Sequence, residues 1–312
     1  MVQHDTSHEV IVDAVADAVY RLIADVAGWP HLFDPTVHVD LLLEEEGAQL
    51  LRIWAMAGGA VHDWTSRHSL DALGRRIAFQ RIVSKPPVAA MSGEWSVTPQ
   101  GPGSCRVVLT HRFETIGAAA PVAAGIAALL AQDSAADLAA IKRAAELGAA
   151  RSELHFSFSD AEMIRGSASA TFDFVRRADA WPLWLPHVSR AELIEDPGGV
   201  QRLTTDTLAP DGSSQTTHSV RLCFPQRREI VYKELDAPGA LMAAHTGRWQ
   251  FEEGDGTVFA RCWHTVTLDA DGIRQEFGAD ASVADVRATL RRTLGAESQL
   301  TLSRARLFVE RG

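Results

Sequence analysis

Apolar and polar residues alternate along most of the first 115 residues, which is the period expected of β-strands with one buried face. Glycine and proline pairs such as Gly58-Gly59 and Pro86-Pro87 interrupt the alternation and mark turns. An amphipathic helix is predicted over residues 15–27 and a long alanine-rich helix over 118–148. The predicted strands cover residues 7–12, 37–44, 49–57, 61–71, 75–84, 91–98 and 104–114.

The same pattern returns in the second half of the chain, which indicates two copies of one fold. Trp29-Pro30 returns as Trp181-Pro182, an offset of 152, and Arg75-Arg76 matches Arg227-Arg228 at the same offset. Farther along, Trp95 matches Trp249 and His111 matches His264 after the offset has slipped. The second copy is predicted to contain an opening strand at 156–164, a helix at 168–179 and a long final helix at 282–310.

Several strands followed by a long helix are typical of the α+β class. We predict two tandem helix-grip domains, residues 1–150 and residues 151–312. In each domain an antiparallel sheet wraps around the long C-terminal helix and leaves an internal cavity. Such a cavity suits apolar ligands, because sheet and helix turn their apolar faces toward a space that they need not fill completely.

Strand parity predicts which side chains line the cavity of the first copy. In strand 61–71, Trp64 and His68 share one face, while charged and hydroxyl side chains occupy the other. Arg81 has the parity of Phe79 and is therefore predicted to point inward. The predicted lining is mostly aromatic with a few polar groups: Trp29, Phe33, Trp64, Ser66, His68, Phe79, Arg81, Met91, Trp95 and His111.

The offsets carry this lining onto the second copy, where the predicted chemistry changes. Lys233 takes the place of Arg81, which keeps a cation, while a serine, a tryptophan and a histidine are replaced. The predicted second pocket consists of Trp181, Trp184, Thr216, His218, Val220, Val231, Lys233, Trp249 and His264.

Arg81 is the most informative of these residues, because burying an unpaired cation costs several kcal/mol. The inward strand faces of the first copy carry no acidic residue, so a functional role is favoured over a structural ion pair. The inference depends on register, since a slip of one residue would turn Arg81 outward. His68, His111 and Ser66 are weaker signals, because each could be a hydrogen-bonded core residue, although a histidine can carry protons near neutral pH.

Composition narrows the possible functions. A formal net charge of −10 argues against nucleic acid, whose binding needs clustered basic residues. Three cysteines without paired spacing indicate a reduced protein, and neither a signal peptide nor a membrane span is predicted, which favours the cytoplasm. No metal-ligand spacing and no glycine-rich phosphate loop is present, so neither a metal nor another cofactor is expected.

The ordered motifs resemble a known family. The runs Trp29-Pro30-His31-Leu32-Phe33 and Asp63-Trp64-Thr65-Ser66-Arg67, followed by Arg81, Met91 and Trp95, are similar to those of the aromatase/cyclases of bacterial type II polyketide synthases. The tandem arrangement resembles their di-domain subclass, within the START (helix-grip) polyketide cyclase superfamily. The resemblance covers nearly the whole chain and is strongest in residues 1–115.

The resemblance implies a cofactor-independent, lyase-like enzyme of antibiotic biosynthesis. Its substrate would be a poly-β-ketone, already ketoreduced at one carbonyl and tethered to an acyl carrier protein. The enzyme would promote aldol closure of the first ring and then loss of water to give an aromatic ring, together with other synthase components. Arg81 corresponds to an arginine regarded as catalytic in single-domain relatives, and Ser66 and the tryptophans correspond to pocket residues.

This sequence departs from those relatives at two positions. It reads Ser66-Arg67-His68 where they often have Ser-His-Arg, so His68 stands at the position of a second pocket arginine. It also has Thr36 where they can have a pocket tyrosine. A catalytic set of Arg81, Ser66 and His68 is therefore expected, with Arg81 polarising a carbonyl, His68 taking a proton and Ser66 orienting water or a hydroxyl.

Two other readings remain open. Helix-grip domains also carry lipids or quinones without chemistry, although a pure carrier would not need Arg81 beside Ser66 and His68. Alternatively, the diverged second copy could serve only to dock partners.

Overall fold

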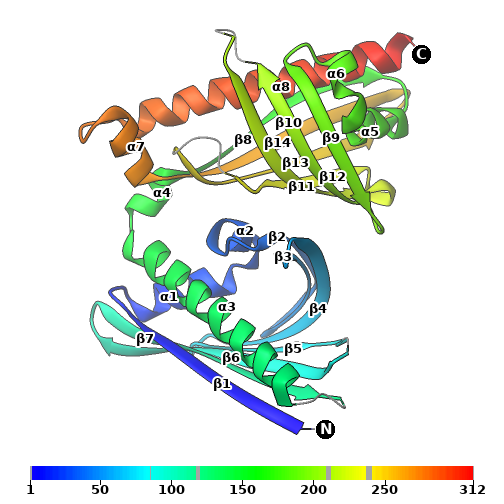
Figure 1. Cartoon of the computed structure of the whole chain (residues 1–312). Coiled ribbons are helices and arrows are strands. Elements are labelled where there is room, and N and C mark those ends of the chain that lie inside the picture. The colour runs from blue at the N-terminus through cyan, green and yellow to red at the C-terminus, as the bar shows by residue number, and fades with distance from the viewer. Residues whose placement is uncertain (1, 85, 117–119, 209–211, 237–240, 312) are drawn as a thin grey trace. The chain divides into compact units, whose positions relative to one another are not determined.

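The computed structural model describes residues 2–84, 86–116, 120–208, 212–236 and 241–311. Its contacts divide the chain into two compact units, Met1–Arg151 and Ser152–Gly312, and each is described by itself. Both units contain a seven-stranded antiparallel sheet and a long helix, so the predicted α+β class with two tandem domains is confirmed (Figure 1).

The first domain follows the predicted order of elements. The first residues of the predicted long helix, 118 and 119, lie outside the described residues. The elements are β1 (Val2–Val12), α1 (Ala16–Ala24), a 3-10 turn (Val26–Gly28), α2 (Trp29–Leu32), β2 (Thr36–Glu45), β3 (Ala48–Ala57), β4 (Ala60–Asp71), β5 (Arg76–Arg81), β6 (Val88–Gly101), β7 (Ser104–Thr115) and α3 (Ala120–Glu146).

The second domain repeats this order and adds helices at both ends. Its elements are α4 (Ala150–Leu154), β8 (His155–Arg165), α5 (Ala168–Arg176), a 3-10 turn (Ala178–Ala180), α6 (Trp181–Trp184), β9 (Val188–Asp196), β10 (Val200–Leu208), β11 (Ser214–Phe224), a 3-10 turn (Pro225–Arg227), β12 (Glu229–Glu234), β13 (Met242–Glu253), β14 (Thr257–Leu268), α7 (Ala270–Phe277) and α8 (Val283–Arg311).

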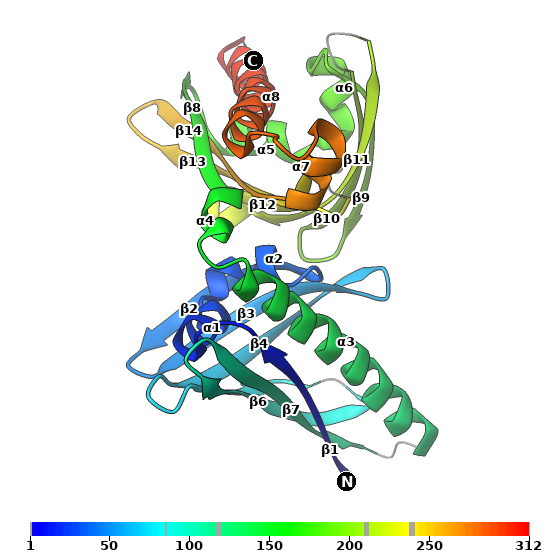
Figure 2. The ribbon, with the colours of Figure 1, turned by 90° about the vertical axis from the view of Figure 1, so that its left-hand side faces the viewer.

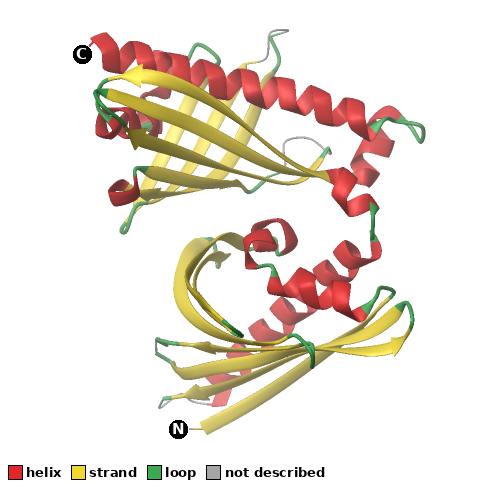
Figure 3. Ribbon diagram, turned by 180° about the vertical axis from the view of Figure 1, so that it is seen from behind, coloured by secondary structure: helices red, strands yellow, loops and turns green. Residues whose placement is uncertain are grey.

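The two sheets have the same topology. Their strand orders are β1-β7-β6-β5-β4-β3-β2 and β8-β14-β13-β12-β11-β10-β9, with every neighbouring pair antiparallel. A view close to the axis of α8 shows the second sheet curving around that helix (Figure 2). Each domain therefore has one layer of strands and one main helical layer, which Figure 3 shows by colour.

The Trp-Pro pairs begin helices and do not end them, which corrects the predicted helices 15–27 and 168–179. α1 ends at Ala24 and α5 at Arg176, and a 3-10 turn then leads into a new four-residue helix that starts at Trp29 or Trp181. Proline is accepted in the first turn of a helix, where its missing N–H has no partner to lose. Helix α7 was not predicted from the sequence, although Asp269 caps it by accepting from the backbone N–H groups of Asp271 and Gly272.

The apolar cores lie between each sheet and its helices. In the first domain, one cluster joins α1 and α2 to the sheet and to the C-terminal half of α3 through residues such as Ile23, Trp95 and Ile141. In the second domain the buried residues form two clusters, one around Phe172 and Trp249 and one around Met242 and Leu294. A core split in this way leaves a space between its two parts.

Candidate functional site

Strand pairing gives the equivalence between the two copies. Ser66 is paired with Arg81 in the first sheet, and Ser219 is paired with Glu234 in the second, so the offset here is 153. Arg75 and Arg228 mark the same point, because both have a left-handed φ, 55° and 48°, just before the short central strand begins. The prediction that Arg75 matches Arg227 was therefore wrong by one residue.

Because side chains alternate across a strand, an offset that is wrong by one residue assigns the outer face of β11 and β12 to the pocket in place of the inner face. The predicted second pocket is therefore corrected. Thr216 and His218 are exposed on the outer face of the sheet, where Thr216 donates to Asp206 Oδ1 and His218 Nδ1 lies 2.5 Å from Asp236 Oδ2. Val220 and Val231 share the parity of these outer positions.

Lys233 is buried, but it does not take the place of Arg81. The cavity is lined instead by its neighbours Tyr232 and Glu234, and Glu234 stands at the position of Arg81. Trp184 is another correction, because it is 44% exposed and packs edge-on against Phe308, with ring centroids 5.2 Å apart. The predicted residues Trp181, Trp249 and His264 do line the cavity.

In the first domain the predicted aromatic residues lie together on the inner face of the sheet. The ring centroid of Trp29 lies 5.6 Å from that of Phe33 and 5.7 Å from that of His68. Phe79 extends this row of rings, with its ring centroid 6.0 Å from that of His68 and 5.5 Å from that of His111. These contacts bring together side chains from α2, β4, β5 and β7.

Trp95 and Met91 complete this inner face on β6. The Trp95 ring is nearly parallel to that of Phe33, at a centroid distance of 6.3 Å and an interplanar angle of 19°, and Met91 is half-buried four residues earlier. Gly93 lies between them, paired with Phe79, and a Cβ at this position would fall 2.3 Å from the Phe79 ring. The missing side chain lets the Phe79 ring lie flat on β6.

Arg81 ends β5 on this inner face, with the parity of the buried Ile77. Its guanidinium carbon lies 4.8 Å from the centroid of the Trp64 ring, and desolvation by burial lowers the pKa of Arg81. Within the described part of the chain, no carboxylate lies at ion-pair distance from Arg81. β5 ends at Arg81, and Val83, which belongs to the predicted strand 75–84, lies beyond it and is 68% exposed.

The two inner histidines are neutral at physiological pH. Burial lowers the pKa of both His68 and His111 to about 4, and His68 is only 3% exposed. His111 Nδ1 lies 3.5 Å from the Oγ of the buried Ser134 on α3, which shows that this face of the sheet is turned toward the helix. Ser66 is also buried, and its hydroxyl donates to the carbonyl of Gln80. A histidine with so low a pKa is a weak proton acceptor.

Asp137 on α3 is a functional candidate that reasoning from strand parity missed. It lies one helical turn beyond Ser134, and burial, followed by repulsion from Asp133 and Asp34, raises the pKa of its carboxyl group to about 7. A carboxyl group with that pKa is well matched to proton transfer near neutral pH. Its signal in the sequence was an acidic pair, Asp133 and Asp137, in an alanine-rich stretch of the helix.

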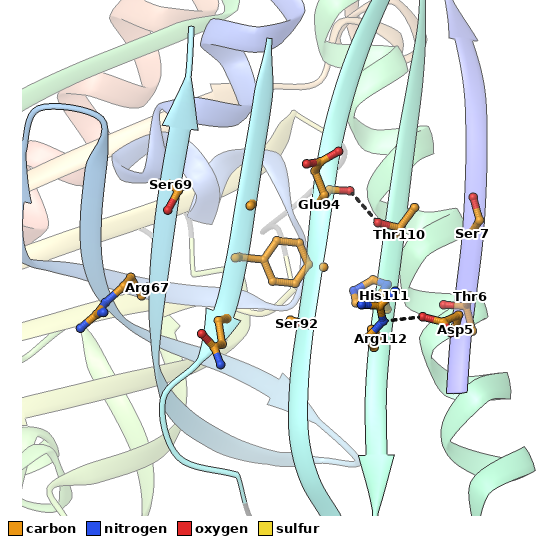
Figure 4. Close-up of a pocket in the computed structure, with 14 residues that line it drawn as sticks. Asp5, Thr6, Ser7, Arg67, Ser69, Ser92, Glu94, Thr110, His111 and Arg112 are labelled. Carbon is orange, nitrogen blue, oxygen red and sulfur yellow. Dashed lines mark hydrogen bonds and ion pairs between the residues drawn. The ribbon is translucent and has the colours of Figure 1, made fainter. Parts of the chain in front are cut away.

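A hollow of about 870 Å³ is bordered mainly by residues of the outer face of the first sheet, together with Phe79 and His111 (Figure 4). Charged and hydroxyl side chains from β1, β4, β6 and β7 line it, including Arg67, Glu94 and the ion pair between Asp5 and Arg112. Arg81 is not among its lining residues. Most of the side chains that border this hollow are polar.

The second domain contains a cavity of about 200 Å³ between its sheet and α8. The cavity separates the two core clusters, because Trp249 from one and Met242 and Leu294 from the other line it. Other lining residues come from β10 to β14 and from α8, among them Thr205, Thr217, Ser219, Arg221, Tyr232, Glu234, His245, His264, Glu297 and Thr301.

Arg221 stands at the position of His68 but serves the structure. It is 2% exposed, and its guanidinium donates to the carbonyls of Val175 and Arg176 at the end of α5, at 2.6 and 3.3 Å. Its guanidinium carbon also lies 5.1 Å from the Trp181 ring centroid. The last carbonyls of a helix lack partners within the helix, so Arg221 caps α5.

No group of three or more His, Cys, Asp or Glu side chains in the described residues is arranged to hold a metal ion. One helix among them, α3, is long and apolar enough to span a membrane. Its C-terminal half packs on the sheet, however, and α8 occupies the same place in the second domain with several arginines.

The chain is similar to proteins of polyketide biosynthesis over nearly its full length. Two family models, both described as polyketide cyclase / dehydrase and lipid transport, match residues 3–146 and 164–296. The actinorhodin polyketide synthase bifunctional cyclase/dehydratase of Streptomyces coelicolor is 40% identical over 97% of this chain and 96% of its own length. The granaticin polyketide synthase bifunctional cyclase/dehydratase of Streptomyces violaceoruber is 39% identical, over 97% of this chain and 93% of its own.

Two solved structures match this chain over both of its domains. The di-domain ARO/CYC BexL of the BE-7585A biosynthetic pathway has a TM-score of 0.89 and 43% identity, covering 98% of this chain and 99% of its own. The di-domain ARO/CYC StfQ of the steffimycin pathway has a TM-score of 0.86 and 29% identity, covering 98% of each chain. The predicted resemblance is thus confirmed, and the chain belongs to the polyketide cyclase/dehydrase family in its di-domain form.

Proposed function

We propose that this protein is a polyketide aromatase/cyclase that closes the first ring of a poly-β-ketone by aldol condensation and removes water to make the ring aromatic. The observation that carries the proposal is Arg81, a cation without a carboxylate partner among the described residues, placed over Trp64 on an inner face rich in aromatic rings. Relatives named as cyclase/dehydratases support an enzyme in preference to a carrier of lipids or quinones.

The same relatives belong to polyketide synthases, so other synthase components are the expected partners. We propose that the substrate arrives on an acyl carrier protein, already reduced at one carbonyl, and that the protein works in the cytoplasm beside the synthase.

In the proposed cyclisation, Arg81 binds the carbonyl oxygen that gains negative charge as the methylene loses its proton. Its hydrogen bonds are worth more here than in water, because the aromatic surroundings lower the local dielectric. Arginine remains protonated, so it is not the base. The flat rings of Trp64, Trp95 and Phe79 would stack on the conjugated chain and fix the bend that brings the reacting carbons together.

Asp137 suits the role of base better than His68, the residue expected from the sequence. A base must be available in its deprotonated form at the working pH and still bind a proton well. A pKa of about 7 meets both conditions near neutral pH, whereas His68, with a pKa of about 4, is deprotonated but binds a proton weakly. We therefore assign proton abstraction to Asp137, while His68 and Ser66 line the floor beside Arg81.

Reconstitution with a minimal polyketide synthase and a ketoreductase tests the proposal. Adding this protein should convert shunt products into a product with the first ring closed and aromatic, as detected by chromatography and mass spectrometry. An unchanged product mixture would overturn the proposal. A lipid or quinone retained by the purified protein, together with that unchanged mixture, would favour a carrier.

A further inference from the structure

The cavity of the second domain contains a chain of ionisable side chains that the proposed cyclisation does not use. Glu234 Oε1 lies 3.0 Å from His245 Nδ1, and His245 Nε2 lies 3.1 Å from His264 Nδ1. The hydroxyl of Tyr232 also reaches His264 Nδ1, at 3.2 Å. All four side chains line the cavity.

Glu297 on α8 adds a carboxyl group from the opposite wall. Desolvation, followed by repulsion from Glu234, raises the pKa of Glu297 to about 7, while the nearby His245 opposes the shift. The residue Glu297 is nevertheless solvent-accessible, and it lines the same cavity. A proton acceptor from the helix therefore faces a carboxylate–histidine pair from the sheet.

Burying these groups is costly, so a structural role alone explains them poorly. Both histidines are nearly inaccessible, His245 at 2% and His264 at 4%, and their stacked rings lie 5.3 Å apart. Apolar side chains would fill the same volume without desolvating two imidazoles and the largely covered carboxylate of Glu234. Acid–base groups assembled in a cavity are more typical of a site for chemistry.

We propose that the second cavity is a separate acid–base site, centred on Glu234, His245 and Glu297, that eliminates water from a β-hydroxy ketone. This inference rests on the proposed function, because the hydroxy ketone is the product of the aldol step. The cavity volume of about 200 Å³ admits a ring-sized part of a substrate and not a long folded chain. The two curated relatives described above are both named bifunctional cyclase/dehydratases.

The elimination balances with these residues. The ionised Glu297 takes a proton from the carbon beside the ketone, and the electrons of that C–H bond form the C=C double bond. The C–O bond of the neighbouring carbon breaks, and the hydroxyl leaves as water with a proton donated by His245. Glu234 beside Nδ1 stabilises the positive charge on the protonated ring, and the proton on Glu297 then returns to His245 to reset the site.

The test uses the full chain in the reconstituted system, with Glu297→Gln and His245→Asn as variants. Each has a matched control outside the cavity: Glu192→Gln on the exposed edge strand β9 and His218→Asn on the outer face of β11. A time course should show the variants accumulating a cyclised product that is heavier by one water, with dehydration slowed about 10²–10⁴-fold. The controls should behave as the unaltered protein does.

The outcomes separate this inference from the proposed function. If the unaltered protein has no effect on the products, the proposed function itself fails. If it forms the aromatic product and both variants do so at the same rate, only the second site is overturned. Open-chain shunt products from the variants would also overturn it, because the cavity would then serve cyclisation.

Misfolding is detected independently by thermal unfolding. Glu297→Gln removes a carboxyl group whose ionisation is disfavoured in the folded protein, so this variant should keep the melting temperature of the unaltered protein or exceed it near pH 8. Slow dehydration combined with an unchanged or raised melting temperature supports the chemical role. Slow dehydration in proportion to a lost fold contradicts it.

Discussion

The two domains place opposite charges at equivalent positions of the same fold. In the first, Arg81 faces Ser66 across β4 and β5, and in the second, Glu234 faces Ser219 across β11 and β12. A cation at this position can stabilise an enolate, whereas a carboxylate there can assist proton transfer. The inner face of the first domain is thus suited to holding negative charge, and that of the second to moving protons.

The neighbouring position shows the same divergence. His68 packs among aromatic rings in the first domain, while the equivalent Arg221 is used to cap α5. Both inner faces contain an arginine. The guanidinium of Arg221 donates to backbone carbonyls, whereas that of Arg81 has no carbonyl or carboxylate partner among the described residues. The fold therefore determines which positions lie close together, while the chemical type of the side chains at those positions differs between the domains.

The largest expected effect comes from removing the cation of the first domain. Arg81→Ala should lower the rate of first-ring formation about 10²–10³-fold, because the developing oxyanion loses its donor. Arg67→Ala, two strands away from β6 on the outer face of β4, is the matched control and should keep the normal rate. Product analysis in the reconstituted system measures both, and normal first-ring product from Arg81→Ala would contradict the comparison.

The next effect concerns proton transfer in the first domain. If Asp137 is the base, the cyclisation rate should rise with pH up to about 7 and then level off, because only the ionised carboxylate accepts a proton. Asp137→Asn should lower the plateau about 10²-fold and abolish this rise. The same loss and the same flat profile in His68→Gln, with Asp137→Asn unaffected, would return the role to His68.

Asp137→Asn should also change stability with a defined sign. The pKa of Asp137 is about 7 when folded, against 3.8 in an unfolded chain, so between these values the folded state holds a proton that the unfolded state has lost. Ionisation therefore favours unfolding as the pH rises through this range. The variant should be more stable than the unaltered protein above pH 7 and no different below pH 4, as measured by denaturant unfolding.

A smaller effect tests the shared glycine of β6 and β13. A Cβ at Gly93 would lie 2.2 Å from the carbonyl oxygen of Thr110, whereas the three atoms nearest to a Cβ at Gly247 all belong to the Tyr232 side chain. A backbone atom yields less than a side chain, so Gly93→Ala should cost about 1–3 kcal/mol of unfolding free energy and Gly247→Ala less. Equal losses in thermal unfolding would show that the two sheets accommodate the aromatic ring in the same way.

Much of the fold could be predicted from the sequence, because alternation and repetition report on secondary structure directly. The inner face of β4 was predicted correctly, since its apolar and hydroxyl positions differ so clearly. The prediction of the second pocket was wrong at β11 and β12. A repeat offset carries an uncertainty of one residue, and neighbouring residues of a strand point to opposite faces. Rare residues such as Trp-Pro fixed the offset near the helices but not across the intervening loops.

The acid–base residues were harder to predict for a different reason. Asp137 and Glu297 come from the long helices, whose inward faces depend on how each helix crosses its sheet. His245 and Glu234 lie on separate strands and meet only through the pairing of β12 with β13. Neither arrangement leaves a spacing in the sequence that could be recognised in a single chain.

The smallest expected effect distinguishes the corrected pocket from the predicted one. His218 and Asp236 form an exposed ion pair on the outer face of the second sheet, 49% and 67% exposed, and such pairs contribute about 0–1 kcal/mol. His218→Ala should therefore leave the products unchanged and shift the melting temperature little, whereas the cavity residue His245 should not tolerate the same change. A product change in His218→Ala equal to that in His245→Ala would mean that the outer face of β11 takes part in the reaction, and the assignment of the inner face as the site would have to be abandoned.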